Sequence, residues 1–257
     1  MADLASSPYF LIVLVVSAFA PPLIFMAWIR NTARYRREPW RTVLKAFAWG
    51  AVFSVLIAIV FSLILIATLG QIGPLNDFLA TRFTDPTFVI GALIVAPIVE
   101  EGAKGVGVRV GRPQTQALLD GLVYGAAAGL GFSATENLFY GLDALLNPNG
   151  GPSASLAVIA VRSFSSSLLH ASSTAVLGYG IAKTWLTPRT WAFLPFYVAA
   201  VIMHATFNLL ASLGQSIAPR YGEFGEAIGF VAAVAFALVA ITVVRFKLAS
   251  PRRAVAR

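Results

Sequence analysis

Two adjacent glutamates, Glu100 and Glu101, lie within an apolar stretch that is long enough to cross a membrane. A carboxylate in hydrocarbon costs several kcal/mol, roughly 3 kcal/mol on membrane-insertion scales. Two neighbouring carboxylates also repel each other, which adds to that cost. Because a chain keeps such a pair only where it is used, this segment is the first candidate for chemistry.

Ionisable and amide side chains also occur in three other apolar stretches of the chain. They are Glu136 with Asn137, then His170, and finally His204 with Asn208. Residues four apart share a helix face, so Lys104 can pair with Glu100, and Phe132 lies on the face of Glu136. The same spacing places His204 and Asn208 on one face.

These residue types can activate water. A glutamate would be the general base, helped by a second glutamate or a histidine, and a His-Asn pair could donate hydrogen bonds to an oxyanion. The alternative is a divalent metal such as zinc, held by Glu136, His170 and His204, which would lower the pKa of its bound water. Glu101 points about 100° away from Glu100, so we expect only Glu100 to face the water directly.

Composition indicates a membrane protein. Of the 257 residues, 58% are hydrophobic and only 12% are charged, whereas soluble domains carry about 25% charged residues. The mean hydropathy is +0.79. The net charge of +8 comes from basic residues between apolar runs, which favours a topology signal over a nucleic-acid surface. The chain has no cysteine, which excludes disulfides, thiolate catalysis and cysteine-bound metal.

We expect a single all-α domain over residues 1–257, built as a bundle of about seven membrane-spanning helices in the cell membrane. The expected spans are Pro8–Ile29, Val43–Leu69, Pro86–Val108, Ala117–Leu146, Ser155–Ile181, Trp191–Leu213 and Glu226–Phe246. The first is expected to be retained, because no Lys or Arg precedes it and its apolar run continues past Pro21 and Pro22.

Basic residues orient the spans. Sixteen of the nineteen lysines and arginines fall in alternate connections or in the C-terminal tail. The positive-inside rule then places the N-terminus outside and the C-terminus in the cytoplasm. We expect the Arg34–Arg41 run to mark topology and to contact anionic lipids. Measured from the outer ends of their spans, the four ionisable sites lie roughly 13 to 23 Å deep, so they can converge.

Three motifs in succession resemble the PrsW family of intramembrane proteases. They are Glu100-Glu101-x-x-Lys104, then Gly129-Leu-Gly-Phe132-x-x-x-Glu136-Asn137, and His204-x-x-x-Asn208, within a motif core over residues 97–210. The family is similar to the CAAX-protease and bacteriocin-processing group, which has histidine where this chain has Glu136.

The resemblance implies an endopeptidase that cleaves a membrane-anchored protein such as an anti-sigma factor. It implies that Glu100 is the base, that Glu136 helps to hold the water, and that His204 with Asn208 stabilises the oxyanion.

Other interpretations stay open. A proton- or cation-coupled transporter would also need buried Glu and His, although such a protein often shows two similar halves and none is evident here. His170 could be a hydrogen-bonded core residue among serines. Gly121, Gly125 and Gly129 form a small-residue ridge that is typical of close helix packing.

Overall fold

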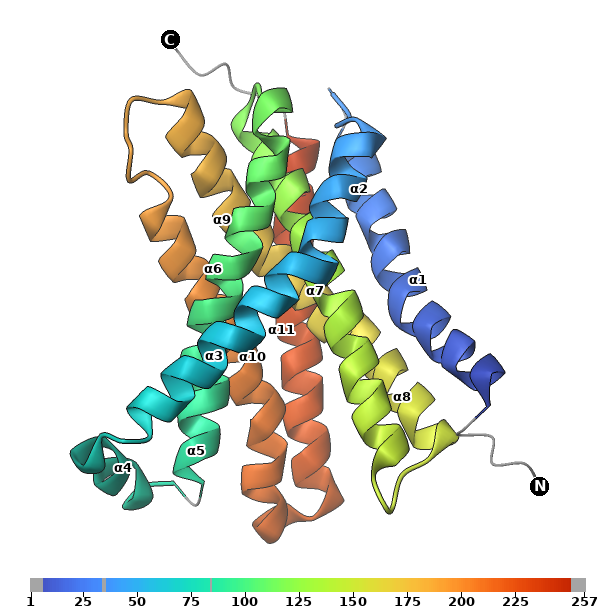
Figure 1. Cartoon of the computed structure of the whole chain (residues 1–257), viewed down its shortest axis with the longest axis vertical. Coiled ribbons are helices and arrows are strands. Elements are labelled where there is room, and N and C mark those ends of the chain that lie inside the picture. Colours follow the sequence, from blue (N-terminus) through green and yellow to red (C-terminus); the bar gives the residue numbers. More distant parts are fainter. Residues whose placement is uncertain (1–6, 34–35, 84, 251–257) are drawn as a thin grey trace.

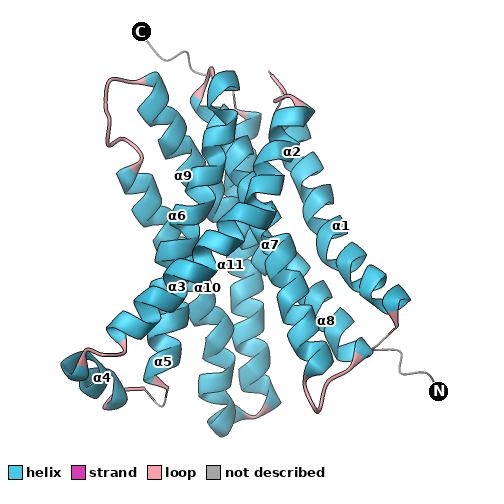
Figure 2. Ribbon diagram, viewed as in Figure 1, coloured by secondary structure: helices cyan, strands magenta, loops and turns pink. Residues whose placement is uncertain are grey.

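The computed structural model of the chain describes residues 7–33, 36–83 and 85–250, and every regular element in these ranges is helical (Figure 2). The α-helices are α1 Pro8–Thr32, α2 Trp40–Trp49, α3 Val55–Leu69, α4 Gly73–Ala80, α5 Pro86–Phe88, α6 Ala96–Val108, α7 Leu118–Leu146, α8 Pro152–Phe164, α9 Ser166–Leu186, α10 Leu194–Tyr221 and α11 Glu223–Ala249. Two π-helices, η2 Gly50–Ser54 and η3 Val89–Val95, and one 3-10 helix, η4 Arg109–Gln114, continue these runs.

Six helical stretches of the described chain are long and apolar enough to cross a membrane: Pro8–Thr32, Trp40–Leu69, Pro86–Gln114, Pro152–Leu186, Leu194–Gly214 and Ala227–Ala249. They overlap six of the seven expected spans, which confirms the polytopic helical bundle. The remaining expected span coincides with α7, a 29-residue helix that also holds Asp120, Glu136 and Asp143. The number of crossings and the orientation in the membrane therefore stay predictions.

Successive stretches run between the two ends of the bundle (Figure 1). The α1–α2, α6–α7 and α9–α10 connections lie at one end, and the α3–α5, α7–α8 and α10–α11 connections lie at the other. This alternation includes α7, which passes through the middle of the bundle. It also gathers the connections rich in Lys and Arg at a single end.

Helix α7 is the centre of the packing. Its residues from Asp120 to Ala134 are all buried, and its largest contact is with α9. A Cβ atom on Gly121, Gly125 or Gly129 would lie 2.1–2.2 Å from a carbonyl oxygen of α9. The glycine ridge therefore lets the two backbones touch, as the packing interpretation of the sequence predicts.

Polarity is reversed relative to a soluble protein. Large apolar side chains such as Phe61, Leu63 and Ile64 are exposed on the outside of the bundle. Glu101, Lys104 and His170 are buried inside it, with at most 2% of each residue exposed. An apolar exterior that surrounds a polar interior is the distribution expected of helices in lipid.

Candidate active site

A change of helix type positions the glutamate pair. The π-helix η3 ends at Val95, and Pro97 follows in the first turn of α6. The wider π turns leave the carbonyl of Ala92 within 2.8 Å of the Asn208 side-chain amide, which donates a hydrogen bond to it. The irregular backbone therefore lies directly before Pro97.

Glu101 points into the protein and is completely buried. Its Oε1 accepts from the Lys104 ammonium at 2.7 Å and from the Ser173 hydroxyl at 2.9 Å, and its Oε2 accepts from Thr174 at 2.9 Å. The Nδ1 atom of His204 lies 3.2 Å from Oε1. These donors satisfy both carboxylate oxygens and hold Glu101 and its neighbours in one arrangement.

Glu100 points instead into a cavity of about 340 Å³. Its side chain is 14% exposed, and its Oε2 atom has no hydrogen-bond partner among the described residues. The nearest charged atoms are Lys104 Nζ at 3.6 Å and His204 Nε2 at 3.8 Å. The structure therefore gives the two glutamates the different orientations that helix geometry predicts.

The expected ion pair of Lys104 with Glu100 is present, but it is the looser of two. Lys104 Nζ is nearer to Glu101, and it also lies 2.9 Å from His170 Nδ1 and 4.7 Å above the Phe132 ring. An ammonium group only donates, so His170 Nδ1 is the acceptor. The predicted residues Phe132 and Lys104 thus contact each other directly.

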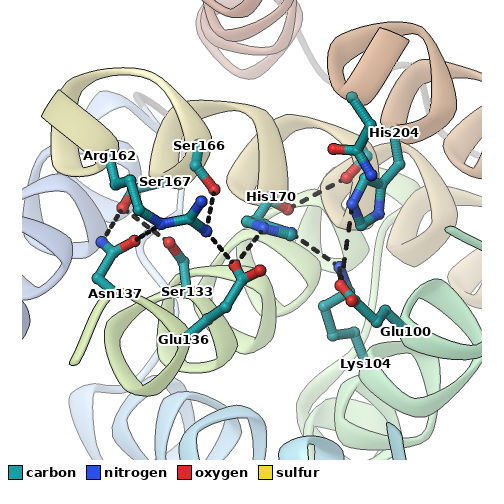
Figure 3. A network of polar contacts seen from close by, with 12 residues as sticks. Glu100, Lys104, Ser133, Glu136, Asn137, Arg162, Ser166, Ser167, His170 and His204 are labelled. Carbon is teal, nitrogen blue, oxygen red and sulfur yellow. Dashed lines mark hydrogen bonds and ion pairs between the residues drawn. The ribbon is translucent and has the colours of Figure 1, made fainter. Parts of the chain in front are cut away.

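His170 joins two polar clusters (Figure 3). Its Nδ1 faces Lys104, and its Nε2 lies 2.9 Å from Glu136 Oε2. Since Nδ1 accepts, Nε2 carries the hydrogen and donates it to the Glu136 carboxylate. The two histidine rings meet edge to face, with centroids 4.9 Å apart, which brings His170 and His204 to one wall of the cavity.

The second cluster centres on Arg162, which lies within an expected span and was not among the residues predicted for the site. Its Nη2 lies 2.8 Å from Glu136 Oε2, its Nε donates to Asn137 at 3.1 Å, and its guanidinium stacks 3.7 Å from the Tyr140 ring. An arginine in an apolar stretch is costly, and that cost was the signal that could have identified it. Asn137 thus supports Arg162 and does not face Glu100 (Figure 3).

A break between two helices brings Arg162 to this position. The sequence predicts one continuous span over Ser155–Ile181, but α8 ends at Phe164 and α9 begins at Ser166, with Ser165 at φ −117° and ψ −76°. The changed direction lets Arg162 Nη2 reach Ser166 Oγ at 3.2 Å. The expected span itself is confirmed, since Pro152–Leu186 is one of the membrane-length stretches, but its helix changes direction at Ser165.

His204 and Asn208 both line the cavity, as their shared helix face predicts. Because Glu101 binds His204 at Nδ1, the Nε2 atom is the one that faces Glu100. Asn208 uses one amide hydrogen on Ala92, so it also ties α10 to the π-helix.

One compact set of metal-ligand types is present among the described residues. Glu100, His170 and His204 each offer one ligand atom, and these atoms lie within 4.8 Å of one another. The expected set of Glu136, His170 and His204 differs in its carboxylate. Glu136 is bound to Arg162 and to His170, whereas Glu100 keeps an oxygen without a hydrogen bond.

Comparison with known proteins identifies the family. The model of the PrsW family of intramembrane metalloproteases matches residues 38–243. Protease PrsW of Clostridioides difficile (strain 630) is 32% identical over 130 residues, which cover 49% of this chain and only 50% of that relative. No solved structure gives a significant match. Since the family model spans most of the chain, this protein belongs to the PrsW family of intramembrane metalloproteases.

Proposed function

We propose that the protein is an endopeptidase that hydrolyses a peptide bond in or near the membrane segment of a membrane-anchored protein, such as an anti-sigma factor. The observation that carries the proposal is the cavity inside the bundle. There a carboxylate oxygen of Glu100 that forms no hydrogen bond with any described residue faces the Nε2 atom of His204 across 3.8 Å. Family membership supports the same activity.

In this proposal Glu100 is the general base. Its free oxygen takes a proton from water as the water oxygen bonds to the peptide carbonyl carbon, and the same carboxyl group returns the proton to the departing amine as the C–N bond breaks. Glu101 acts through His204, since its hydrogen bond at Nδ1 fixes the ring with Nε2 toward the cavity. A carboxylate behind a histidine holds both the tautomer and the orientation of the ring.

The oxyanion would be stabilised by His204 and Asn208. Both residues line the cavity, and the second amide hydrogen of Asn208 is available for donation. Arg162 adds a positive charge to the opposite wall, where it is held by Glu136. Preorganised donors and charges of this kind stabilise negative charge most strongly where water is excluded.

The family description implies a metal, and the residues present fit one. Glu100, His170 and His204 are the carboxylate and imidazole ligands that divalent zinc prefers. Glu100 also supplies a buried oxygen that forms no hydrogen bond with any described residue. His170 would have to release Lys104 or Glu136, because both of its nitrogens are engaged. When bound, such an ion would polarise the peptide carbonyl and acidify water.

Reconstitution in liposomes with a single-span substrate protein tests the activity. We expect the wild type to cleave and Glu100→Gln to lose at least ~100-fold in rate, on the scale of general-base catalysis. Asp143→Asn, which neutralises an exposed carboxylate of the same bundle, is the matched control and should cleave normally. Equal cleavage by wild type and Glu100→Gln would overturn the assignment, and proton flux without cleavage would favour a transporter.

Metal dependence has a separate readout. We expect about one equivalent of divalent metal per chain in protein purified without chelator, and loss of metal in His204→Ala. Chelation should abolish cleavage and added zinc should restore it. If metal-free protein cleaves at the full rate, the metal assignment is overturned and the glutamate mechanism stands without it.

A further inference from the structure

A second hollow lies on the outside of the bundle, where α6, α9 and the start of α10 meet. It has a volume of about 650 Å³. Its walls are mostly apolar and include Val106, Leu177, Ile181, Phe193 and Tyr197. It is distinct from the cavity that holds Glu100, since the two share no lining residue. We call it the α6–α9 groove.

Two arginines line the α6–α9 groove where α6 passes into η4. Arg109 and Arg112 are three residues apart in a 3-10 helix, which has three residues per turn, so both lie on one face. Both are exposed, and neither forms an ion pair with any residue that the structure describes. The guanidinium of Arg112 lies 6.0 Å from the ring of Trp185, a residue type enriched at membrane interfaces.

The combination points to one kind of ligand. Two guanidinium groups on one face match the oxygens of a phosphate, which arginine binds in a fork. An apolar wall that continues from this point along α6 and α9 suits an acyl chain in the hydrocarbon layer. A free phosphate would use only the arginines, and an apolar helix of a protein would use only the wall.

We propose that the α6–α9 groove binds one anionic phospholipid, with its phosphate between Arg109 and Arg112 and an acyl chain against Val106 and Leu177. The groove lies at the end of the bundle where the Lys- and Arg-rich connections gather, which the positive-inside rule places at the anionic leaflet. Helix α6 carries both the groove and the glutamate pair, so a bound lipid would contact the helix that positions the active site.

Lipid retention measured by native mass spectrometry in neutral detergent tests the proposal without any substrate. We expect one phosphatidylglycerol to bind saturably per chain, and phosphatidylcholine to bind at least tenfold more weakly. Arg109→Gln with Arg112→Gln should weaken phosphatidylglycerol binding at least tenfold. Val106→Trp should also weaken it, since this residue is 42% exposed and lines the groove.

A charge-matched control distinguishes a specific lipid-binding site from non-specific electrostatic attraction of anionic lipid to the basic end of the bundle. Arg41→Gln with Lys45→Gln removes two exposed positive charges from the same end of the bundle, outside the groove, and should leave the bound lipid in place. Equal loss in both double variants would overturn the site, as would full retention in Val106→Trp. Competition by glycerol phosphate as strong as that by lipid would show a phosphate site only and would also overturn it.

Discussion

At the scale of single residues, the two glutamates differ because one helical step separates an interior face from a cavity face. Glu101 is surrounded by donors from three helices, whereas Glu100 keeps a free oxygen beside His204. A carboxylate saturated with donors is a poor base, and one with a free oxygen next to a cavity can take a proton. Substitutions of the two glutamates should therefore have different effects on stability and activity.

Glu101→Gln should lower stability as well as activity. The change leaves the buried Lys104 ammonium without its closest carboxylate, and an uncompensated buried charge costs roughly 3–5 kcal/mol. Thermal unfolding in detergent should show a clear drop in Tm for this variant. Glu100→Gln should melt close to the wild type, because its oxygen makes no hydrogen bond. Equal Tm values for the two variants would contradict the different roles.

Arg162 should act through Glu136. Replacing it with Gln removes the 2.8 Å ion pair and frees Glu136 to move with His170, so we expect cleavage to fall about 10- to 100-fold, the usual effect of losing an orienting partner. Arg162→Lys should recover part of the rate. In a double-mutant cycle with Glu136→Gln, the two losses should be far from additive. Additive losses would show that Arg162 works independently of Glu136.

Helix periodicity alone predicts the pairing of Glu100 with Lys104, and the structure confirms that ion pair. The sequence could not show that Lys104 lies nearer to Glu101, since the spacings of three and four residues are equivalent until side-chain positions are known. The sequence also could not show that Glu100, and not Glu136, is the carboxylate of the candidate metal site. Glu136 is paired with Arg162, which reaches it from another helix.

At the scale of elements, the site depends on how closely α7 approaches α9. Gly129 lies against the backbone of His170, where a Cβ would be 2.2 Å from the carbonyl oxygen. Small residues in membrane helices allow such contact, and a larger one forces the backbones apart.

Gly129→Ala should therefore displace His170 and lower both Tm and cleavage. We expect cleavage to fall at least ~10-fold, because small displacements of catalytic groups have large effects. Gly102→Ala is the matched control within the bundle, since its Cβ would meet only the Tyr197 side chain, at ordinary distances of 3.7 and 3.9 Å. The two variants can be compared by melting and by cleavage in the same preparation. A Gly129→Ala protein with a normal rate would show that α9 adjusts without moving His170.

The irregular backbone of two elements was beyond the reach of sequence. The π-helix Val89–Val95 is completed by the Asn208 bond to Ala92, a contact between residues 116 positions apart. The nearest Pro and Gly in the two helices, Pro152 and Gly178, are each 13 residues from the break at Ser165, so no local signal marks it. In both cases tertiary partners override local helix propensity.

The connection between α1 and α2 is locked to α7 by Glu38, which is fully buried although it lies outside the spans. The Tyr124 hydroxyl donates to its Oε2, and Arg30 Nε donates to its backbone carbonyl at 2.7 Å. Burial raises the pKa of Glu38 from 4.5 to about 7, although the Tyr124 hydrogen bond and Arg36 lower it, and Asp120 raises it further.

This raised pKa makes stability depend on pH. The folded protein binds the Glu38 proton more tightly than the unfolded chain, so the stabilisation is complete below about pH 4.5 and is lost as pH rises through about 7. The loss is at most ~3 kcal/mol. We expect the Tm in detergent to fall from pH 5 to pH 8, and Glu38→Gln, which keeps the acceptor for Tyr124, to flatten that slope. An unchanged slope in the variant would contradict this origin.

At the scale of the whole molecule, composition and architecture disagree only at α7. Its Asp120, Glu136 and Asp143 and its five glycines lower its hydropathy, yet it lies at the centre of the bundle and runs between the two ends (Figure 1). A helix that is enclosed by other helices does not need an apolar surface, because lipid does not reach it. The arrangement of the connections therefore favours the seven-pass prediction, while hydropathy supports six of the passes.

The absence of cysteine makes this topology directly testable, since any introduced thiol is unique. Asn149 lies in the exposed α7–α8 connection and Gln116 in the exposed α6–α7 connection, at opposite ends of the bundle. If the positive-inside rule holds, a membrane-impermeant maleimide should label Asn149→Cys in intact cells and Gln116→Cys only after permeabilisation. The reverse pattern would invert the orientation and place the Glu100 cavity nearer the cytoplasmic leaflet. Labelling of both variants from outside would show that α7 does not cross the membrane and would overturn the seven-pass prediction.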